Sequence, residues 1–412
     1  MKERLKAPEL RFPGFTDYWV QRKLGDLIEE KWIVRQSDGN HGNLYPRSEE
    51  FVDSGVPYVA ASNISSDGNS IDFSTVKYLP QRRADLFKKG VAFDGDILLA
   101  HNATVGPVLR LHTSFDKVIL STTLTLYRVD SEKIDPDFFL QNLRSSMFQN
   151  QLFETMKQST RNQVPILAQQ KLSISITSNL DEQERIGKLL TLLDDLIATN
   201  QRKLDLLKEQ KKGYLQKMFP KNGAKVPELR FAGFADDWEE RKLGDEVLIV
   251  MGQSPNSENY TDNPNDHILV QGNADMKNGH VFPRVWTTQV TKQAEKNDLI
   301  LSVRAPVGDI GKTDYDVVIG RGVAAIKGNE FIFQNLGKMK SDGYWTRYST
   351  GSTFESINSS DIKEAIISIP RIEEQQKIGS FFKQLDNTIA LHQSKLDLLK
   401  QQKKGYLQKM FV

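Results

Sequence analysis

The sequence contains no cysteine and no long apolar run. The absence of cysteine among 412 residues excludes disulfides and thiolate metal sites, and it fits a reducing compartment such as the cytoplasm. No stretch reaches the roughly 18 apolar residues that a membrane-spanning helix needs. The opening residues, MKERLKAPEL, also lack the apolar core of a secretory signal. We therefore expect a cytoplasmic protein without membrane association.

Sequence signatures of catalysis are missing as well. There is no GxxxxGK[S/T] phosphate loop, no glycine-rich methyl-donor loop and no Asn-Pro-Pro-Tyr-type base-methylation motif. The six histidines are scattered and, without cysteine, form no zinc pattern. We interpret the acidic pairs Asp194–Asp195 and Asp236–Asp237 as solvated faces. We expect a chain with no catalytic residue, metal or cofactor of its own.

The charge of the chain is nearly balanced. Lysine and arginine number 55 against 53 acidic residues, which leaves a formal net charge of +2. Nucleic-acid binding would therefore depend on local basic patches and not on bulk charge. An apolar content of 38% and a charged content of 26% fit a globular chain with true cores, and the length suits two or three domains.

Two segments of the sequence each occur twice. KLDLLKEQKKGYLQKMF at 203–219 returns at 395–411 with one difference in seventeen positions. PELRFPGFTDYWVQRKLGD at 8–26 returns as PELRFAGFADDWEERKLGD at 227–245, with fourteen of nineteen positions identical. The chain is thus a tandem duplication with constant ends. Constant segments suit a partner common to both halves, whereas the middles suit contacts that differ.

These repeats define the expected domains. We expect one domain at 1–180 and another at 220–371, each followed by a long helix, at 181–219 and at 372–412. The two middles match poorly but share landmarks, which pair Asn63 with Asn273, Asp96 with Asp298, and Gly106 with Gly308.

The closing segments are predicted to be long helices that pack on each other in antiparallel fashion. Carboxylates stand at the start and cations near the end of each, as the helix dipole favours, and apolar residues follow heptad spacing. Packing of each helix on its own domain remains the alternative. We expect Asn200 and His392, which hold equivalent polar positions, to lie near the middle of the pair, although a solvent-exposed His392 is also possible. The predicted seam comprises Leu190, Leu193, Ile197, Asn200, Leu204, Leu207, Phe382, Leu385, Ile389, His392, Leu396 and Leu399.

The variable middles mix short apolar runs with turn residues, which predicts α+β domains built on a small sheet or partial barrel. Predicted strands lie at 96–100, 118–129, 298–303 and 317–326, and predicted helices at 135–156 and 330–340.

The loops of both middles carry side chains suited to DNA. Arginine suits guanine, asparagine and glutamine suit adenine, and lysine, serine and threonine suit phosphate oxygens. Polar loops are also ordinary on any surface, so each residue alone is a weak candidate. The candidate DNA contacts are Arg35, Asn40, His41, Arg47, Asn63, Arg82, Arg83, His101, Asn102, Arg161, Gln253, Ser254, Asn256, Asn273, Lys277, Arg304, Arg321, Arg347 and Thr353.

The whole chain resembles the specificity subunit of type I restriction–modification enzymes. The likeness rests on the two PELRF-GF…W…RKLGD openings, the turns at Asp96 and Asp298, the STRNQ and GSTFESI stretches, and the Glu-Gln-initiated helices that end in KKGYLQKMF. The double order of these pieces makes the likeness specific.

This resemblance implies two target recognition domains related by a pseudo-twofold axis and separated by two long antiparallel coiled-coil helices. Each domain would read one half of a bipartite double-stranded DNA target. The helices would dock two modification subunits, which bring S-adenosylmethionine and methylate adenine. The resemblance leaves open whether two restriction subunits, with ATP and Mg²⁺, also join. The chain itself would be non-catalytic.

Two other functions remain open from the residues alone. A non-enzymatic assembly scaffold with two protein-binding domains would differ by lacking DNA binding that depends on sequence and salt. A nuclease or methyltransferase with an unrecognised site would show activity as an isolated chain.

Overall fold

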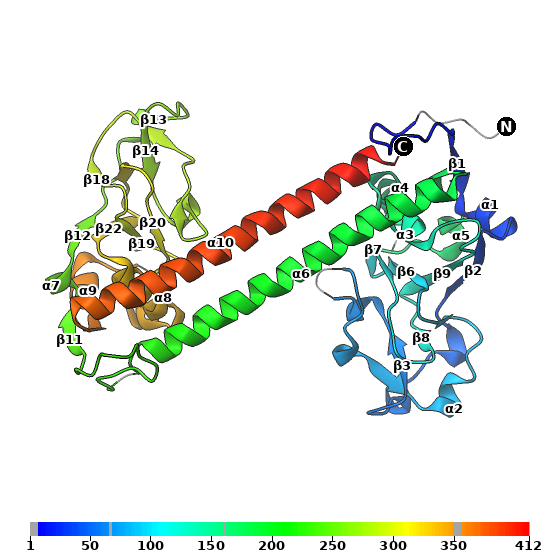
Figure 1. Ribbon diagram of the computed structural model, residues 1–412, viewed down its shortest axis with the longest axis horizontal. Coiled ribbons are helices and arrows are strands. Elements are labelled where there is room, and N and C mark those ends of the chain that lie inside the picture. The colour runs from blue at the N-terminus through cyan, green and yellow to red at the C-terminus, as the bar shows by residue number, and fades with distance from the viewer. Residues whose placement is uncertain (1–6, 66–67, 160, 222, 349–355, 412) are drawn as a thin grey trace. The chain divides into compact units, whose positions relative to one another are not determined.

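The computed structural model describes residues 7–65, 68–159, 161–221, 223–348 and 356–411, except the side chains of Asn43, Arg347 and Tyr348. The chain divides into two compact units. Unit 1 comprises residues 1–201 and 395–412, and unit 2 comprises residues 202–394. Each unit combines sheets with helices (Figure 1), which confirms the predicted α+β class. Each unit includes a part of both long helices, and the expected domain limits stay a prediction.

Unit 1 contains a short two-stranded ladder and two four-stranded sheets among its described residues. The ladder pairs β1 (Trp19–Lys23) with β10 (Ser173–Thr177). One sheet has the order β2 (Ile33–Asp38), β9 (Leu124–Val129), β6 (Ile97–Asn102), β7 (Thr104–Arg110), and the other β4 (Lys77–Leu79), β3 (Val56–Val59), β8 (Val118–Leu120), β5 (Val91–Ala92). The helices are α1 (Leu24–Glu29), α2 (Gln81–Ala84), α3 (Pro136–Arg144), α4 (Ser146–Lys157), α5 (Ile166–Gln169) and the first part of α6 (Leu180–Met218).

Unit 2 has the same arrangement, but its two larger sheets contain more strands than those of unit 1. Its ladder pairs β11 (Glu239–Lys242) with β23 (Ile366–Ile369). One sheet has the order β12 (Leu248–Met251), β22 (Val323–Lys327), β19 (Leu299–Ser302), β20 (Ile310–Lys312), β16 (His280–Val281), β15 (Met276–Lys277). The other has the order β13 (Tyr260–Thr261), β17 (Trp286–Thr287), β14 (His267–Val270), β21 (Val317–Ile319), β18 (Lys292–Ala294). The helices are α7 (Leu243–Glu246), α8 (Glu330–Ser341), α9 (Ser359–Lys363) and most of α10 (Ile372–Lys409).

Matching hydrogen bonds show that the two domains are copies of one fold. β3 pairs in parallel with β8, and β14 pairs in parallel with β21. The turn before the central strand is also shared: Asp96 accepts the N–H of Phe93 at 2.8 Å, and Asp298 accepts the N–H of Glu295 at 2.8 Å. Both carboxylates are buried. The landmark pair Asp96 and Asp298 therefore occupies one position of the duplicated fold.

The landmark pair Asn63 and Asn273 does not correspond in this way. The Asn63 side chain accepts the N–H of Ala60 at 2.8 Å and so closes the 3-10 turn that follows β3. In unit 2 the carboxylate of Asp275 closes the equivalent turn, accepting the N–H of Gln271 at 2.8 Å. Asp275 is thus the counterpart of Asn63, and both are buried.

Two predicted strands are each broken by a turn. The segment 118–129 forms β8 and β9 around Ser121–Thr123, and the segment 317–326 forms β21 and the start of β22 around Gly320–Gly322. In each turn the N–H that opens the next strand donates to the carbonyl of the first turn residue, at 3.3 and 3.2 Å. The chain crosses from one sheet to the other at these points, which apolar periodicity alone does not reveal.

The predicted helix at 135–156 is likewise two helices. Ser145 has extended backbone angles, φ −61° and ψ 151°, and ends α3. Its hydroxyl accepts the N–H of Phe148 at 3.3 Å and caps α4. Serine is favoured at helix N-caps because its hydroxyl can accept an N–H of the first turn.

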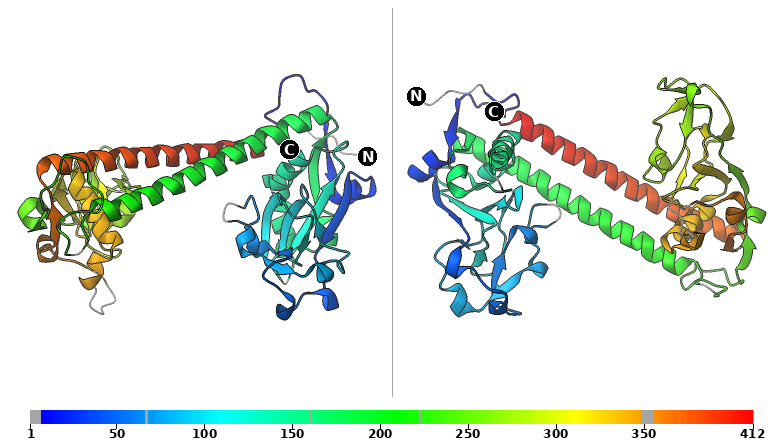
Figure 2. Two further views of the ribbon diagram at one scale, coloured as in Figure 1. Left: turned by 60° about the horizontal axis from the view of Figure 1, so that its bottom comes forward. Right: turned by 180° about the vertical axis from the view of Figure 1, so that it is seen from behind.

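The two long helices run antiparallel, as contacts inside each unit show (Figures 1 and 2). In unit 1, Lys403 of α10 bonds to Asp194 of α6 at 2.5 Å. In unit 2, Lys211 of α6 bonds to Asp386 of α10 at 2.6 Å. The start of each helix therefore lies beside the end of the other.

Most of the predicted seam is buried. The Asn200 amide donates to the carbonyl of Leu196 in its own helix at 2.7 Å. The Nδ1 atom of His392 is buried without a partner among the described residues. The proximity of Asn200 and His392 stays a prediction. The buried members of the seam are Leu190, Leu193, Ile197, Asn200, Leu204, Phe382, Leu396 and Leu399, whereas Leu207, Leu385, Ile389 and His392 are half-buried.

Asp194 is not on a solvated face, contrary to the prediction. Its carboxylate is 13% exposed and accepts bonds from Gln141 and Arg144, both at 2.8 Å, in addition to the one from Lys403. It thereby joins α3, α6 and α10 of unit 1.

A buried ion pair ties the constant opening of each half to the start of a long helix. Arg11 binds both carboxylate oxygens of Glu182 at 2.5 and 2.8 Å, and Arg230 binds both of Glu374 at 2.7 and 2.8 Å. The two glutamates are at most 1% exposed. The constant motifs PELRF and Glu-Gln are thus two parts of one contact.

The other long helix ends at the same place. The N–H of Leu10 donates to the carbonyl of Lys409 at 3.0 Å, and that of Leu229 donates to Lys217 at 2.8 Å. Phe411, just after α10, packs 6.2 Å from Trp19, and Phe219, just after α6, packs 6.0 Å from Trp238, measured between ring centroids. We call these contact groups the first junction (Leu10, Arg11, Trp19, Glu182 and Phe411) and the second junction (Phe219, Leu229, Arg230, Trp238 and Glu374).

The junction pair makes a stability prediction. Arg11→Met should leave the Glu182 carboxylate buried without its partner, which typically costs about 3–5 kcal/mol. We expect a lower unfolding temperature for unit 1 in calorimetry. Lys188→Met, an exposed change on the same helix, should leave it unchanged, and adding Glu182→Met to Arg11→Met should recover most of the loss. An Arg11→Met protein as stable as the parent would contradict the role of the pair.

Candidate nucleic-acid interface

In the first domain, polar side chains gather at the hairpin between β6 and β7. Asn102 forms a backbone bridge with Gln163, and its amide donates to the carbonyl of Thr122 at 3.5 Å. The N–H of Ala103 donates to the carbonyl of Asn162 at 3.0 Å. We call Asn102, Thr122, Asn162 and Gln163 the first tip cluster. Three chain segments that lie far apart in the sequence thus meet at one hairpin tip.

The second domain builds the same place from different residues. Arg304 forms a backbone bridge with Ser356, as Asn102 does with Gln163. The hydroxyl of Ser254 accepts the N–H of Arg321 at 3.1 Å. We call Ser254, Arg304, Arg321 and Ser356 the second tip cluster. Arg304 and Arg321 are exposed, and within the residues that the structure describes neither guanidinium has an ion-pair partner.

Shared backbone bonds establish which positions of the two clusters correspond. The N–H of His101 donates to Thr123, and the N–H of Val303 donates to Gly322. Because the following residues and the preceding turn residues then also match, Asn102 corresponds to Arg304 and Thr122 to Arg321. At these two positions the first cluster presents an amide and a hydroxyl, whereas the second presents two guanidinium groups without an ion-pair partner among the described residues. Amides pair well with adenine and guanidinium groups with guanine. The same backbone arrangement therefore holds side chains that suit different bases in the two domains.

His101 lies beneath the first tip cluster and not on its surface. It is 5% exposed, and its Nδ1 lies 3.1 Å from the carbonyl of Val164. Burial lowers the pKa of its imidazole below the ordinary value, so the ring is neutral at pH 7. A neutral ring donates from Nδ1 to Val164 and holds the segment that carries Gln163. The predicted DNA contact by His101 is therefore replaced by a structural role.

Other predicted contacts also serve the fold. Asn40 is 7% exposed and donates to the carbonyl of Lys89 at 2.7 Å. Arg83 binds Glu50 at 2.6 Å and the carbonyl of Leu44 at 3.1 Å. Asn40, Arg83 and the turn-closing Asn63 donate their hydrogen bonds to other groups of the protein. We therefore no longer expect these three side chains to contact bases.

The remaining predicted residues that the structure describes lie at exposed or half-buried positions. Arg161 and Gln253 are exposed and adjoin the tip clusters in the sequence. Arg35 donates to the carbonyl of Lys88 at 2.7 Å. Thr353 lies outside the described residues, as does the side chain of Arg347. The other candidates are exposed or half-buried: Arg35 in β2, Arg82 in α2, Lys277 in β15, and His41, Arg47, Asn256 and Asn273 between the strands and α-helices. These contacts stay predictions.

Sequence reasoning missed Thr122, Asn162, Gln163 and Ser356. Asn162 and Gln163 lie in the STRNQ stretch and Ser356 in the GSTFESI stretch, so the sequence marked these segments but not these residues. Aligning the two halves would have paired Asn102 with Arg304, and the structure adds that the segment after α4 returns to the same tip.

Within the described residues, no group of three or more His, Asp or Glu side chains is arranged to hold a metal ion. None of the described helices is both long and apolar enough to span a membrane.

Comparison with known proteins decides the family. The model for the type I restriction modification DNA specificity domain matches residues 17–209 and again residues 235–401. The chain belongs to the type I restriction–modification specificity family. The expected family and function are thereby confirmed: the chain is a DNA specificity subunit, which is the non-catalytic part of such a system and has DNA and a methyltransferase subunit as partners. The repeated match fits recognition of a bipartite target.

Individual relatives agree with this family. The chain is 28% identical over 401 residues to the "Putative type I restriction enzyme MjaX specificity subunit" of Methanocaldococcus jannaschii, covering 94% of this chain and 91% of the relative. It is 24% identical over 198 residues to the MjaVIII specificity subunit of the same organism, covering 46% of this chain and 45% of the relative.

Solved structures show the same fold. The specificity subunit of M. genitalium matches with a TM-score of 0.67 at 16% identity and 99% coverage of both chains. A chain from a study of complex assembly and conformational transition in a type I system matches with a TM-score of 0.51 at 22% identity, covering 97% of both chains.

The second tip cluster makes a specificity prediction. Arg304→Gln removes a guanidinium suited to guanine, so methylation by the complex with the modification subunit should relax at one base pair of one half-site. A lost bidentate contact costs about 1–3 kcal/mol of discrimination. Sequencing of methylated DNA measures the change. Lys292→Gln, which removes an exposed cation from β18 of the same domain, should leave the motif intact. An unchanged motif in Arg304→Gln would rule out base reading by this residue.

Proposed function

We propose that each domain of this specificity subunit reads one half-site of a bipartite double-stranded DNA target through its tip cluster. Two copies of the modification subunit then dock on the helix pair, one in each unit. The modification subunits supply S-adenosylmethionine and methylate adenine in each half-site. Where restriction subunits join, ATP and Mg²⁺ act there. All of this takes place in the cytoplasm.

One observation carries the proposal: identical junctions support unlike tip clusters. The bonds Arg11–Glu182 and Arg230–Glu374 match atom for atom. By contrast, the amide of Asn102 and the hydroxyl of Thr122 in the first cluster correspond to the guanidinium groups of Arg304 and Arg321 in the second. Sequence is read at base edges, so domains with unlike donors favour unlike half-sites.

The helices present a face suited to the shared partner. Five leucines on α6 and α10 are between 47% and 68% exposed: Leu192, Leu196, Leu206, Leu391 and Leu398. With the seam at heptad positions a and d, all five occupy positions c or g. In an antiparallel pair the g flanks of both helices adjoin, so the leucines of each unit lie on one flank: Leu192, Leu196 and Leu398 in unit 1, and Leu206 and Leu391 in unit 2. Exposed apolar clusters of this kind mark protein interfaces.

Leu206 and Leu398 are repeat equivalents, and they are 59% and 54% exposed. One lies in unit 2 and the other in unit 1. Two matching patches therefore favour two copies of one partner.

The modular reading of half-sites is tested by exchange. Replacing residues 28–180 with the corresponding segment of another family member should change one half-site and preserve the other, because the second tip cluster is untouched. Mapping of methylated adenines reports both half-sites at once. A change in both would show that the domains do not read independently.

The docking face makes a stoichiometry prediction. Leu206→Asp or Leu398→Asp should each remove one of two modification subunits, and the double variant should remove both, since a charge at a buried apolar contact is strongly unfavourable. Native mass spectrometry counts the copies. Leu86→Asp, at a 56% exposed leucine of the first domain, serves as the control and should retain two. A double variant that also retains two copies would place the docking surface elsewhere.

A further inference from the structure

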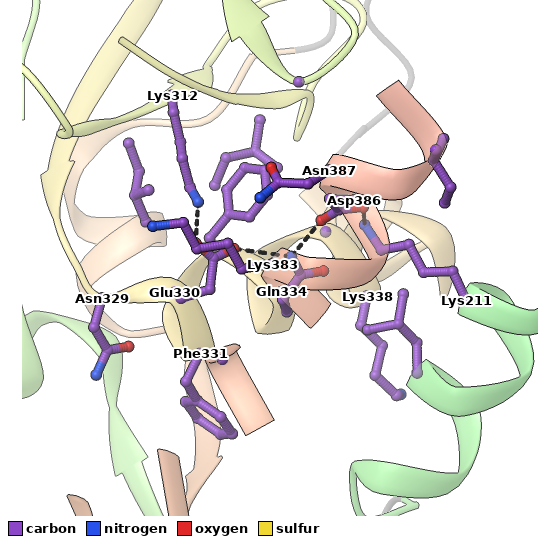
Figure 3. A pocket seen from close by; sticks show the side chains of 18 of the residues that line it. Lys211, Lys312, Asn329, Glu330, Phe331, Gln334, Lys338, Lys383, Asp386 and Asn387 are labelled. Atoms are coloured by element: carbon purple, nitrogen blue, oxygen red, sulfur yellow. Dashed lines mark hydrogen bonds and ion pairs between the residues drawn. The ribbon is translucent and has the colours of Figure 1, made fainter. Parts of the chain in front are cut away.

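A cavity of about 1130 Å³ lies in unit 2 between the long helices and the second domain (Figure 3). β20, α8 and the loops beside them form one wall, and α6 and α10 form the other. A chain of polar contacts crosses it: Lys312 to Glu330, Glu330 to Gln334, Gln334 to Asp386, and Asp386 to Lys211. The two lysines and the two carboxylates of this network neutralise one another.

Comparison of equivalent positions in the two units shows why the cavity exists in unit 2. Gln334 contacts Asp386 as Gln141 contacts Asp194, so Gly337 stands three residues later where unit 1 has Arg144. Arg144 fills this space in unit 1, donating to Asp194 and to the carbonyl of Val108, both at 2.8 Å. A methyl group at Gly337 would meet only the side chain of Ile310, 4.0 Å away.

The cavity wall carries exposed cations from both long helices. Lys208 and Lys212 of α6 and Lys383 of α10 line it. All three are exposed and have no ion-pair partner among the residues that the structure describes. The charged residues of α6 and α10 that line the cavity are four lysines (these three and Lys211) and one aspartate (Asp386), so this side of the helix pair is positive overall.

The lysines and the exposed leucines lie on opposite flanks of the helix pair. Every residue of α6 and α10 that lines the cavity falls at heptad positions a, b, e or f, whereas the leucines fall at c or g. The recognition domain therefore sits on the lysine flank.

The same cations recur in unit 1. Lys400 and Lys404 of α10 are the repeat equivalents of Lys208 and Lys212, and they are also exposed without an ion-pair partner among the described residues. Lys403 bonds to Asp194 as Lys211 bonds to Asp386. Each unit therefore has two constant lysines four residues apart, without an ion-pair partner in the described part of the chain, on the flank that faces its recognition domain.

This pattern fits a polyanion that is the same for both halves. Contacts to DNA phosphates carry no sequence information, so they belong on the constant part of a chain whose variable parts read bases. Lysine binds phosphate as a point charge, and it is depleted in protein–protein interfaces. The leucine flank already offers the surface that a protein partner favours.

We propose that Lys208 and Lys212 in unit 2, and Lys400 and Lys404 in unit 1, bind the phosphate backbone of the target DNA and hold it without reading its sequence. This inference rests on the proposed reading of DNA by the two domains. It adds a constant, sequence-independent contact to the variable ones.

Salt dependence of binding tests the inference. The complex of this chain with its modification subunit is titrated with a duplex that carries the target and with one that lacks it, between 50 and 200 mM salt. Each phosphate contact contributes about 0.9 to the slope of log affinity against log salt. Lys208→Gln with Lys212→Gln should therefore lower the slope by about 1.8, and Lys400→Gln with Lys404→Gln should do the same. Affinity should fall equally on both duplexes, while the methylated sequence stays the same.

A matched variant controls for net charge. Lys203→Gln with Lys395→Gln removes two exposed lysines from the same helices at position g, on the leucine flank, and should leave the slope unchanged. An unchanged slope in the variant that combines Lys208→Gln, Lys212→Gln, Lys400→Gln and Lys404→Gln would overturn the inference. So would loss of the modification subunit in native mass spectrometry with an unaltered slope, because the lysines would then contact protein.

If the parent complex does not prefer the duplex that carries its target, the proposed function itself fails. If the parent complex prefers its target and the lysine variants leave the slope unaltered, only the phosphate contact is contradicted.

Discussion

A buried arginine–glutamate fork at the start of each long helix is the contact on which the rest of the structure depends. Glu182 and Glu374 are at most 1% exposed, and a carboxylate so buried requires a close cation. Arg11 and Arg230 supply it from the constant opening segments. Because the end of the opposite helix is bonded at the same junction, each helix starts in one unit and ends in the other. The near-identity of the two helices follows: each must satisfy the same contacts at both ends.

On this constant framework the two domains differ where it matters for DNA. The backbone bonds around the β6–β7 hairpin recur in unit 2, yet Asn102 is replaced by Arg304 and Thr122 by Arg321. The two flanks of the helix pair differ: exposed leucines lie at positions c and g, and lysines with no ion-pair partner in the described structure lie at b and e. Variable tips suit base edges, one constant flank suits protein and the other suits phosphate. A single chain can thus offer two specificities to one kind of partner.

The sequence alone predicted the duplication, the α+β class, the long helices and the family, because these rest on repeats and periodicity that extend over many residues. It did not predict the breaks at Ser145, Ser121–Thr123 and Gly320–Gly322, where the chain turns through local hydrogen bonds. Residue type also failed to separate reading side chains from structural ones. Asn63 and His101 have the polar chemistry of a DNA contact but are buried and bonded internally, whereas Gln163 reaches the tip cluster only through the path of the backbone. The counterpart of Asn63 is Asp275, a shift of two positions from the expected landmark that only the shared turn reveals.

The most direct test of the central claim, one framework carrying two unlike readers, is to map methylated adenines genome-wide in cells that contain this chain and its modification subunit. The account predicts a single motif of two different half-sites, separated by a spacer of fixed length and arbitrary sequence, with one methylated adenine in each half. A continuous motif, or two identical half-sites, would contradict it.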